Sequence, residues 1–269
     1  MPEGHTLHRL ARLHKRRYAG APVGVSSPQG RFAREASILD GQVMVSAEAY
    51  GKHLFHDYGP LGTVHIHLGL YGTFAEQRLP EAEPVGQVRL RLAGATHWTD
   101  LRGPNRCELL TPPEVAAIVD RLGPDPLRRD ADPDRAWRRI SRSRTSIAAL
   151  LMDQSVLAGV GNVYRAEVLF RHGIAPTVPG RALDETVWKD IWADLVGLMR
   201  AGVRTGRIDT VADEHLPEVT GRAPRVDRHG GEVYVYRRTG QPCLVCGTPV
   251  AHADLAGRNL YWCPVCQST

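Results

Sequence analysis

The sequence predicts an α+β protein with a β-rich first half, a helical second half and a small metal-binding unit at the C-terminus. Short runs of β-strand character, separated by glycine and proline, fill the first half. Apolar residues at helical spacing dominate the second half, and four cysteines in two pairs lie near the end of the chain. A chain of 269 residues is long enough to bury a core without help from disulfides or metal.

An amphipathic helix is expected almost directly after the N-terminus. Leu7, Leu10 and Leu13 recur at helical spacing, and basic residues occupy the opposite face. From about residue 20 to 110 the pattern changes to short runs, several of which alternate apolar and polar residues as strands with one wet face do. They predict an antiparallel β-sandwich or barrel with strands at 23–25, 42–45, 53–55, 63–68, 88–92 and 96–99.

Five prolines between Thr111 and Asp134 mark a linker region, which includes one short helix at 114–121 with Thr111 as its N-cap. Residues 203–231 show little periodicity and predict a long mobile loop. Residues 233–236 and the cysteine pairs predict a small β-hairpin unit. Further helices are expected at 134–141, 145–152, 162–172 and 184–201, and we divide the chain into 1–115, a linker at 116–133, 134–232 and 233–269.

The charge of the chain favours a nucleic-acid partner. Lysine and arginine number 34 against 29 acidic residues, which gives a net charge of +5. Only three of the 34 cations are lysine, and arginine grips phosphate through two parallel hydrogen bonds, although a GC-rich genome would also raise the arginine content. No apolar run reaches the ~18 to 20 residues that cross a bilayer, and no secretory signal is visible, so we expect a soluble cytoplasmic protein without membrane contact.

The strongest single signal is Cys243-x-x-Cys246 followed, after sixteen residues, by Cys263-x-x-Cys266. Each pair can hold one side of a tetrahedral Zn²⁺, and a site closed by four thiolates is structural because it leaves no open position. Redox cysteines and disulfides are the weaker alternatives. We therefore expect one structural zinc ion per chain, with Arg258 near the tip of the intervening hairpin.

A second signal lies between two predicted helices, at residues 153–162. Two glycines allow a tight turn, and the backbone N–H groups at the start of the next helix form a natural phosphate nest, with Asn162 as N-cap or donor. Turns of this kind also occur without a ligand, so phosphate binding and plain turn chemistry both stay open.

The N-terminus is the third signal. Proline at position 2 permits removal of Met1, which would leave a secondary amine on Pro2 beside the carboxylate of Glu3. Such an amine can attack an electrophilic sugar carbon and form an iminium, although many proteins open on these residues without N-terminal chemistry. Lys52 lies at an expected β-turn, where its ammonium can hold a phosphate or relay a proton.

These signals follow one another along one chain, from Pro2-Glu3-Gly4 through Gly51-Lys52 and 153–162 to the cysteine pairs with Arg258. Together they resemble the formamidopyrimidine-DNA glycosylase and endonuclease VIII family of bifunctional base-excision repair enzymes, over nearly the full length. The resemblance implies an N-terminal β-sandwich catalytic domain, a helix-two-turn-helix domain and a zinc finger. It also implies damaged DNA as the partner, as a duplex or in single-stranded or bubble form, and a nucleoid-associated monomer.

In the family that the chain resembles, the N-terminal proline, here Pro2, attacks C1′ of the damaged nucleotide and expels the base. Glu3 matches the adjacent carboxylate, which handles protons, and Lys52 matches a β-turn lysine that contacts a phosphate beside the lesion. Asn162 and Arg258 match the residues that hold backbone phosphates around the extruded sugar. The resemblance thus implies a DNA glycosylase that also cuts the strand as an AP lyase, by β,δ-elimination.

Flipping a nucleotide out of the duplex also requires a side chain that fills the vacated stack. Leu70 and Tyr71 lie where the family carries such residues, and a core role for either is the alternative. Arg102 matches the arginine that faces the orphaned base, although the loop Arg102-Gly103-Pro104 departs from the family's usual Arg-Phe-Gly. No role is assigned to Cys107.

The opening residues and the leucine–tyrosine pair resemble the endonuclease VIII branch, which favours oxidised pyrimidines. A preference for oxidised purines is the first alternative. A non-catalytic protein that binds damaged DNA is the second, and an RNA-binding zinc ribbon is the third.

Overall fold

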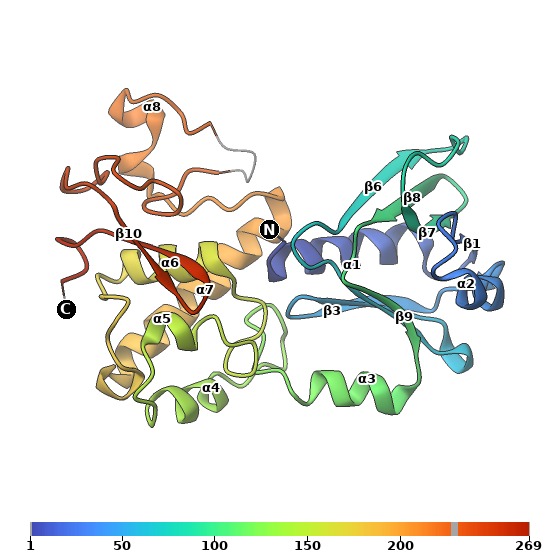
Figure 1. The fold of residues 1–269 in the computed structure, drawn as a ribbon, viewed down its shortest axis with the longest axis horizontal. Helices are drawn as coiled ribbons and strands as arrows, with labels where there is room; N and C mark the ends of the chain where they lie inside the picture. Colours follow the sequence, from blue (N-terminus) through green and yellow to red (C-terminus); the bar gives the residue numbers. More distant parts are fainter. Residues whose placement is uncertain (1, 227–230, 269) are drawn as a thin grey trace. The chain divides into compact units, whose positions relative to one another are not determined.

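The computed structural model describes residues 2–226 and 231–268. The chain forms two compact units, Met1–Arg121 and Leu122–Thr269, and each has its own hydrophobic core (Figure 1). Among the described residues, no helix is long and apolar enough to span a membrane.

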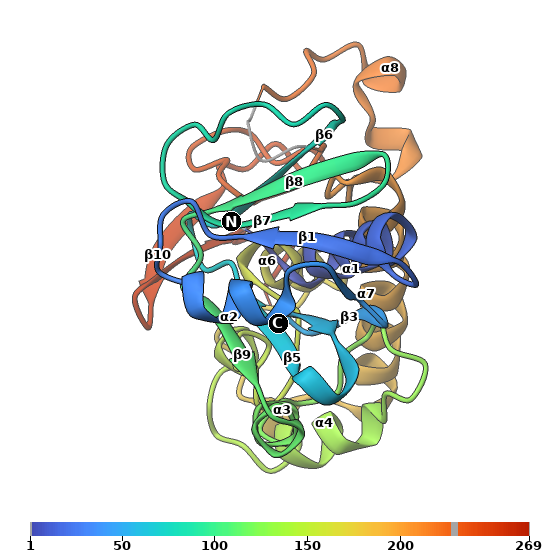
Figure 2. The same cartoon turned by 90° about the vertical axis from the view of Figure 1, so that its right-hand side faces the viewer.

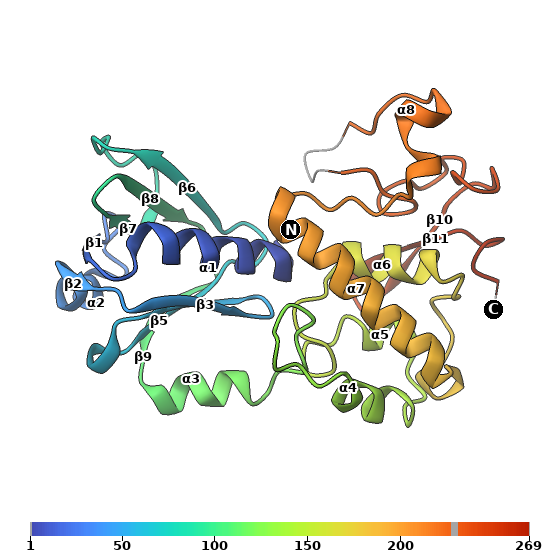
Figure 3. The same cartoon turned by 180° about the vertical axis from the view of Figure 1, so that it is seen from behind.

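The first unit is a β-sandwich with one long helix. Its elements are α1 (Gly4–Tyr18), β1 (Pro22–Ser26), α2 (Ala33–Leu39), β2 (Gln42–Val43), β3 (Ser46–Tyr50), β4 (His53–Asp57), the 3₁₀ turn η1 (Gly59–Leu61), β5 (Thr63–His67), β6 (Thr73–Arg78), β7 (Val88–Ala93), β8 (His97–Arg102), β9 (Arg106–Leu110) and α3 (Pro112–Val119). The two antiparallel sheets have the strand orders β2-β1-β7-β8-β6 and β3-β4-β5-β9. Figures 2 and 3 show α1 between the two sheets, and buried side chains of α1 and both sheets share one core.

The helix α1 forms where its apolar spacing predicts. Leu7 and Tyr18 are buried on one side, whereas Arg9 and Arg12 are exposed on the other. Three basic residues in its last turn face the negative end of the helix dipole, which stabilises that end. The helix therefore fixes its first residues against the sandwich.

The predicted sandwich is confirmed, and each predicted strand run contains a strand. The sequence pattern misses β3, β6, β9 and α2. Strand β6 is half-buried or exposed along its whole length, and β3 carries small alanines on its buried face, so neither shows the alternation of large apolar residues that marks a strand. The run at 42–45 yields only the two-residue strand β2.

The helix expected at 114–121 is α3, which begins at Pro112. Thr111 is its N-cap, as predicted, and the reciprocal hydrogen bonds of a capping box join Thr111 and Glu114. Prolines fit the first helical turn because its N–H groups need no partner inside the helix. The segment 116–133 contains the end of α3 and then no regular helix or strand before Pro133.

The second unit is helical and carries a β-hairpin near its end. Its elements are α4 (Pro133–Ile140), α5 (Ile147–Leu150), α6 (Asn162–Arg171), η2 (Gly180–Ala182), α7 (Glu185–Thr205), η3 (Asp213–His215), α8 (Pro217–Thr220), β10 (Ala251–Leu255) and β11 (Arg258–Trp262). Residues 162–170 of α6 are all buried. Helix α7 packs beside α6 through a stripe that includes Trp188, Ile191 and Leu195.

Several expected boundaries in the second unit differ from the structure. The helix at 145–152 shortens to α5, and the helix at 184–201 extends to Thr205, where Gly206 ends it with a φ of 79°. The expected loop at 203–231 contains the end of α7, η3 and α8, and its residues 227–230 lie outside the described residues.

The prediction that residues 233–236 start a β-hairpin is wrong. The backbone N–H groups of Tyr234, Val235 and Tyr236 donate to the buried carboxylate of Glu167 on α6 instead of a neighbouring strand, at 2.7 to 2.9 Å. Because the carboxylate takes these donors, no strand partner is needed. The hairpin is formed by β10 and β11, between the two cysteine pairs.

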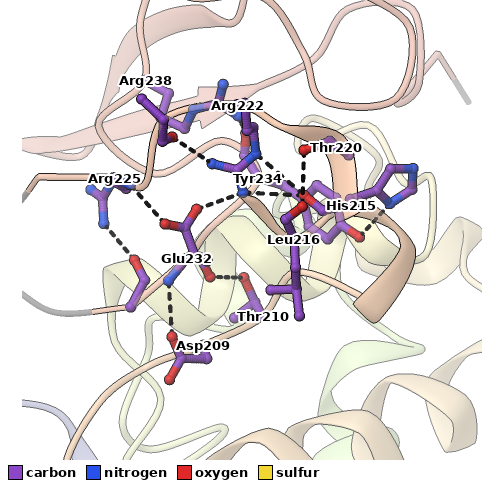
Figure 4. A network of polar contacts seen from close by, with 12 residues as sticks. Asp209, Thr210, His215, Leu216, Thr220, Arg222, Arg225, Glu232, Tyr234 and Arg238 are labelled. Carbon is purple, nitrogen blue, oxygen red and sulfur yellow. Dashed lines mark hydrogen bonds and ion pairs between the residues drawn. The ribbon is translucent and has the colours of Figure 1, made fainter. Parts of the chain in front are cut away.

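A polar network also anchors the chain where it returns from the segment after α7 (Figure 4). Glu232 accepts a hydrogen bond from the Arg225 backbone (2.7 Å) and pairs with the Arg222 guanidinium (2.6 Å). The Glu232 N–H donates to Asp209 (2.9 Å). These contacts therefore tie the two ends of the segment to each other.

Candidate functional site

The first described residues lead directly into α1. Glu3 is the N-cap of α1, with an extended backbone (φ −116°), and it is fully buried. The positive end of the helix dipole stabilises a carboxylate at this position. Pro2 is half-buried and immediately precedes it. The two residues whose chemistry the sequence singles out thus lie together at the end of a helix that is packed into the sandwich.

His5 follows in the first turn of α1 and is buried. Burial, and after it the charge of Arg9, lowers the pKa of His5 to about 4. The imidazole is therefore neutral at pH 7 and adds no positive charge beside Pro2 and Glu3.

Lys52 lies on the two-residue turn between β3 and β4, as predicted. Tyr50 pairs with His53 across the hairpin, and Gly51 adopts a φ of 57°, which glycine does without steric cost. Lys52 is half-buried. Burial, followed by neighbouring charges that include Lys52, lowers the pKa of His53 to about 3. The turn thus holds one cation beside a neutral imidazole.

Leu70 and Tyr71 lie on the loop between β5 and β6. Their exposed fractions are 47% and 82%, so a core role is excluded for both. The loop is tight, because the Gly72 N–H donates to the Leu68 carbonyl oxygen (2.9 Å) and a Cβ at Gly72 would collide with that oxygen. Two apolar side chains are therefore presented to the outside on a turn whose backbone is fixed.

Arg102 ends β8 and is anchored within the first unit. Its guanidinium donates to Asp100 (2.7 Å) and to the Val85 carbonyl oxygen (3.0 Å). Asp100 is fully buried and also binds Arg91. The Arg102 guanidinium is therefore engaged inside its own unit.

In the second unit, the structure brings Asn162 next to the tip of the hairpin. The Asn162 side-chain amide donates to the carbonyl oxygen of Asn259 (2.8 Å), and Arg165 donates to the same oxygen (2.9 Å). Arg258, the neighbour of Asn259, is exposed at the start of β11. The two residues expected to hold phosphates thus come from α6 and from a strand that packs against it.

The backbone explains both positions. Gly161 is the N-cap of α6, so of the two roles expected for Asn162, N-cap or donor, the structure shows the donor: Asn162 is the first helical residue and its amide donates a hydrogen bond. Ala256 and Gly257 form the hairpin turn with φ values of 52° and 71°, as a tight turn with two positive φ angles requires. The turn ends directly before Arg258, which is the first residue of β11.

The loop before α6 is closed by one side chain. Gln154 accepts a hydrogen bond from the Gly159 N–H (3.0 Å) and donates to the Val160 carbonyl oxygen (2.9 Å). Ser155 donates to Asp153 in the same loop. Turn chemistry therefore accounts for the shape of this segment without a ligand.

The four paired cysteines form a site that fits zinc. Their Sγ atoms all lie within 4.8 Å of one another, and Cys243–Cys266 and Cys246–Cys263 are 3.9 and 3.5 Å apart. A tetrahedral zinc ion with Zn–S bonds of about 2.3 Å places its sulfurs about 3.8 Å apart. The donor set and its spacing match one structural zinc ion, and a disulfide between these cysteines is excluded because all four are free.

Three protein-family models together match most of the chain. Residues 1–107 match the formamidopyrimidine-DNA glycosylase N-terminal domain, 122–213 its H2TH domain, and 240–269 the zinc finger found in FPG and IleRS. Endonuclease 8 1 of Mycobacterium tuberculosis is 58% identical over 275 residues, which cover 100% of both chains. The chain belongs to the formamidopyrimidine-DNA glycosylase and endonuclease VIII family.

Further relatives come from both branches of this family. Probable endonuclease 8 2 of Streptomyces coelicolor is 32% identical and covers 100% of this chain and 94% of its own. The solved complex of Lactococcus lactis Fpg with DNA containing an abasic site is 22% identical, with a TM-score of 0.79, and covers 99% of this chain and 100% of that one. The predicted family, the helix-two-turn-helix fold and the enzyme class of DNA glycosylase and AP lyase are therefore confirmed.

The sequence patterns do not single out several residues that shape the site. Arg165 has no motif of its own, and it is fully buried although its sequence position looks like one of many surface arginines. His53, His65 and Glu108 form a hydrogen-bonded chain beside the Lys52 turn. Strand alternation places His65 on the same face as His67, but it carries no signal for the long-range contact with Glu108.

Proposed function

We propose that the chain excises oxidised bases from DNA by attack of the Pro2 amine, once Met1 is removed, on C1′ of the damaged nucleotide. The observation that carries the proposal is the Pro2-Glu3 pair at the start of α1 in a member of this family. A secondary amine can form the positively charged iminium that subsequent elimination requires.

The chemical steps assign one task to each residue. The Pro2 nitrogen forms a bond to C1′ while the bond between C1′ and the base breaks, and the base takes up a proton as it leaves. Glu3 is the proton carrier nearest in sequence to the amine, for sugar ring opening and for removal of the C2′ proton. Loss of that proton expels the 3′ phosphate, and the next elimination expels the 5′ phosphate.

Gripping the extruded nucleotide is the task of the basic residues. Lys52 on its turn is a compact point charge for a phosphate beside the lesion. On the second unit, Asn162 and Arg258 supply hydrogen-bond donors for phosphates of the DNA backbone. The two residues are held together by Asn259, which follows Arg258 and accepts a hydrogen bond from Asn162. Exposed Leu70 and Tyr71 are suited to fill the vacated stack because their loop is rigid and their side chains are apolar.

Arg102 fits the role of facing the orphaned base less well. Its guanidinium is already held by Asp100 and by the Val85 carbonyl oxygen. These bonds use two of its five N–H donors and fix the orientation of the guanidinium, so a base contact is limited to the remaining donors in that orientation.

Oxidised pyrimidines are the proposed substrates, since the chain is 58% identical over its full length to a protein named endonuclease 8 1. Oxidised purines are the alternative, because formamidopyrimidine-DNA glycosylases also match across most of the chain. The proposed setting is a monomer in the cytoplasm, associated with the nucleoid.

A cleavage and trapping panel tests the proposal. Duplexes with an oxidised pyrimidine, oxidised guanine or an abasic site are incubated with the protein, with and without borohydride. We expect a covalent adduct with the wild type and none with Pro2→Ala, and fastest cleavage at the oxidised pyrimidine. Binding without cleavage or adduct on every duplex would instead identify a non-catalytic damaged-DNA-binding protein.

A further inference from the structure

A hydrogen-bonded chain of ionisable side chains crosses the second sheet next to the Lys52 turn. The register places His65 on β5 opposite Phe55 on β4 and Glu108 on β9, and His53 lies at the end of β4 that joins the turn. His53 Nδ1 is 2.8 Å from His65 Nε2, and His65 Nδ1 is 3.0 Å from Glu108 Oε1. Two hydrogen bonds therefore connect His53 to Glu108 without a break.

The chain runs from the half-buried ring of His53 through the buried ring of His65 to a carboxylate in contact with water. Leu54 and Ile66, which alternate with the residues of the hydrogen-bonded chain, belong to the core. The side chains of His53, His65 and Glu108 therefore lie on the face of the sheet that points away from this core. The His65 side chain is only 4% exposed, whereas that of Glu108 is 37% exposed. His65 can therefore exchange protons with its two neighbours, and Glu108 can exchange them with solvent.

The hydrogen bonds determine where the protons lie. Burial lowers the pKa of His53 and His65, so both rings are neutral at pH 7. A carboxylate only accepts, so His65 Nδ1 carries a proton and donates it to Glu108. His65 Nε2 is then unprotonated and accepts from His53 Nδ1. His53 Nε2 is left as a proton acceptor, one residue from Lys52.

We propose that His53, His65 and Glu108 form a proton relay between the Lys52 turn and bulk water. The inference rests on the proposed function, which supplies the protons to be moved. A proton that reaches His53 Nε2 releases the Nδ1 proton to His65 Nε2, and the His65 Nδ1 proton passes to Glu108 and then to water. Each ring gains one proton and loses one.

The reaction resets the relay. After one outward transfer both imidazoles are in the opposite tautomer, and one inward transfer restores them. In the resting tautomers His53 Nε2 accepts a proton, so the C2′ proton is carried outward first. The next proton taken up at the site, at expulsion of the base in the following turnover, travels inward and restores both rings.

The surroundings lower the pKa of both rings, and the hydrogen bond to Glu108 offsets this only in part at His65. Lys52 precedes His53, and Arg121 follows α3. Both positive charges, together with the His65 and His67 rings, lower the pKa of His53. Arg106 on β9 lies 3.7 Å from Glu108 and acts on His65. On β3, Glu48 is the acidic residue paired with Phe55 on the same face. A proton arriving at the imidazoles is therefore passed on to Glu108.

The sharpest variant is Glu108→Gln, which keeps the size and the acceptor oxygen but cannot take up a proton. Glu48→Gln is the matched control, because it removes the same charge from the same face of the same sheet. Single-turnover strand scission on a saturating abasic duplex is measured from pH 6 to 9 in weak and in concentrated imidazole buffer. Pro2→Ala and borohydride trapping run in parallel.

We expect Glu108→Gln to slow scission about tenfold, below the roughly 10²-fold or larger effect of a group that acts on the substrate directly. Concentrated imidazole should restore its rate and leave wild type and Glu48→Gln unchanged. A Glu108→Gln rate equal to that of Glu48→Gln, or a loss that imidazole does not restore, overturns the relay. Failure of the proposed function is distinct, because trapping would then be absent or would survive Pro2→Ala.

Discussion

Glu167 is a fully buried carboxylate on α6 that accepts four hydrogen bonds. Three come from the backbone of residues 234–236, and the fourth comes from the Thr210 hydroxyl at 2.6 Å. A glutamate in a helix looks like a surface residue in the sequence, so no local pattern identifies it. The long-range contacts of this one residue replace the strand that the apolar run 233–236 suggests.

Replacing Glu167 by glutamine should destabilise the second unit. The amide would turn an NH₂ group toward donors, leaving buried N–H groups without an acceptor at a cost of about 1–3 kcal/mol. Urea unfolding measures the change, with the exposed Glu218→Gln as the control. Equal unfolding free energies for the two variants would contradict this role.

Buried histidines make the first unit sensitive to acid. His14 and His56 are fully buried and share a hydrogen bond of 2.9 Å between their rings. Burial lowers the pKa of His56 to about 3 and that of His14 well below its usual value. Both rings are neutral when folded, whereas the unfolded chain takes up protons near pH 6.5.

The contribution of these two histidines to the free energy of unfolding should therefore be complete above about pH 6.5. It should decrease as the pH falls toward their pKa values in the folded state. Each such histidine contributes up to about 1.4 kcal/mol per pH unit below pH 6.5. Urea unfolding of the first unit at pH 7 and pH 5, followed by Trp98 fluorescence after subtraction of a Trp98→Phe variant, measures the loss. An unchanged midpoint would show that these rings are not buried in their neutral form.

At the scale of elements, the sequence is most informative where a local rule fixes the geometry. The N-cap at Thr111, the Gly51-Lys52 turn and the cysteine spacing all appear in the structure as expected. Prediction from the sequence fails where long-range contacts determine the secondary structure. The polar residues of β6, for example, form a strand because β8 pairs with them. Asn162 shows both cases, since its place at the helix start is local but its bond to Asn259 is not.

The zinc hairpin should act as a single element. With Cys246→Ser, or after chelation, the four-sulfur site is incomplete, and the binding free energy that folds the hairpin is lost. We expect one zinc ion per wild-type chain, and loss of damaged-DNA affinity in the variant, while the His14–His56 core of the first unit keeps its stability. Metal analysis and fluorescence anisotropy test this, and full affinity in zinc-free protein would contradict it.

Arg258 on this hairpin should contribute one phosphate contact. Arg258→Ala is expected to weaken damaged and undamaged DNA alike and to reduce the slope of log affinity against log salt by about 1. Arg200→Ala, at an exposed position on α7, is the control and should leave the slope unchanged. An unchanged slope for Arg258→Ala would remove it from the phosphate contacts.

For the whole molecule, the proposed work is divided between the two units. Pro2, Glu3 and Lys52 belong to the first, whereas Asn162, Arg258 and the zinc site belong to the second. The motifs and their order predict the family and both folds, because each motif depends on local spacing. The buried networks around Glu167 and His65 could not be predicted, because their partners are far apart in the sequence.

The most direct measurement locates the borohydride-trapped adduct by digesting the complex and weighing its peptides. The chain has only three lysines, Lys15, Lys52 and Lys189, so few amines compete with the N-terminus. We predict that the DNA-derived mass lies on the peptide that begins with Pro2, and that protein retaining Met1 gives none. An adduct on a lysine peptide, or equal trapping by the form that retains Met1, would contradict catalysis by the Pro2 amine.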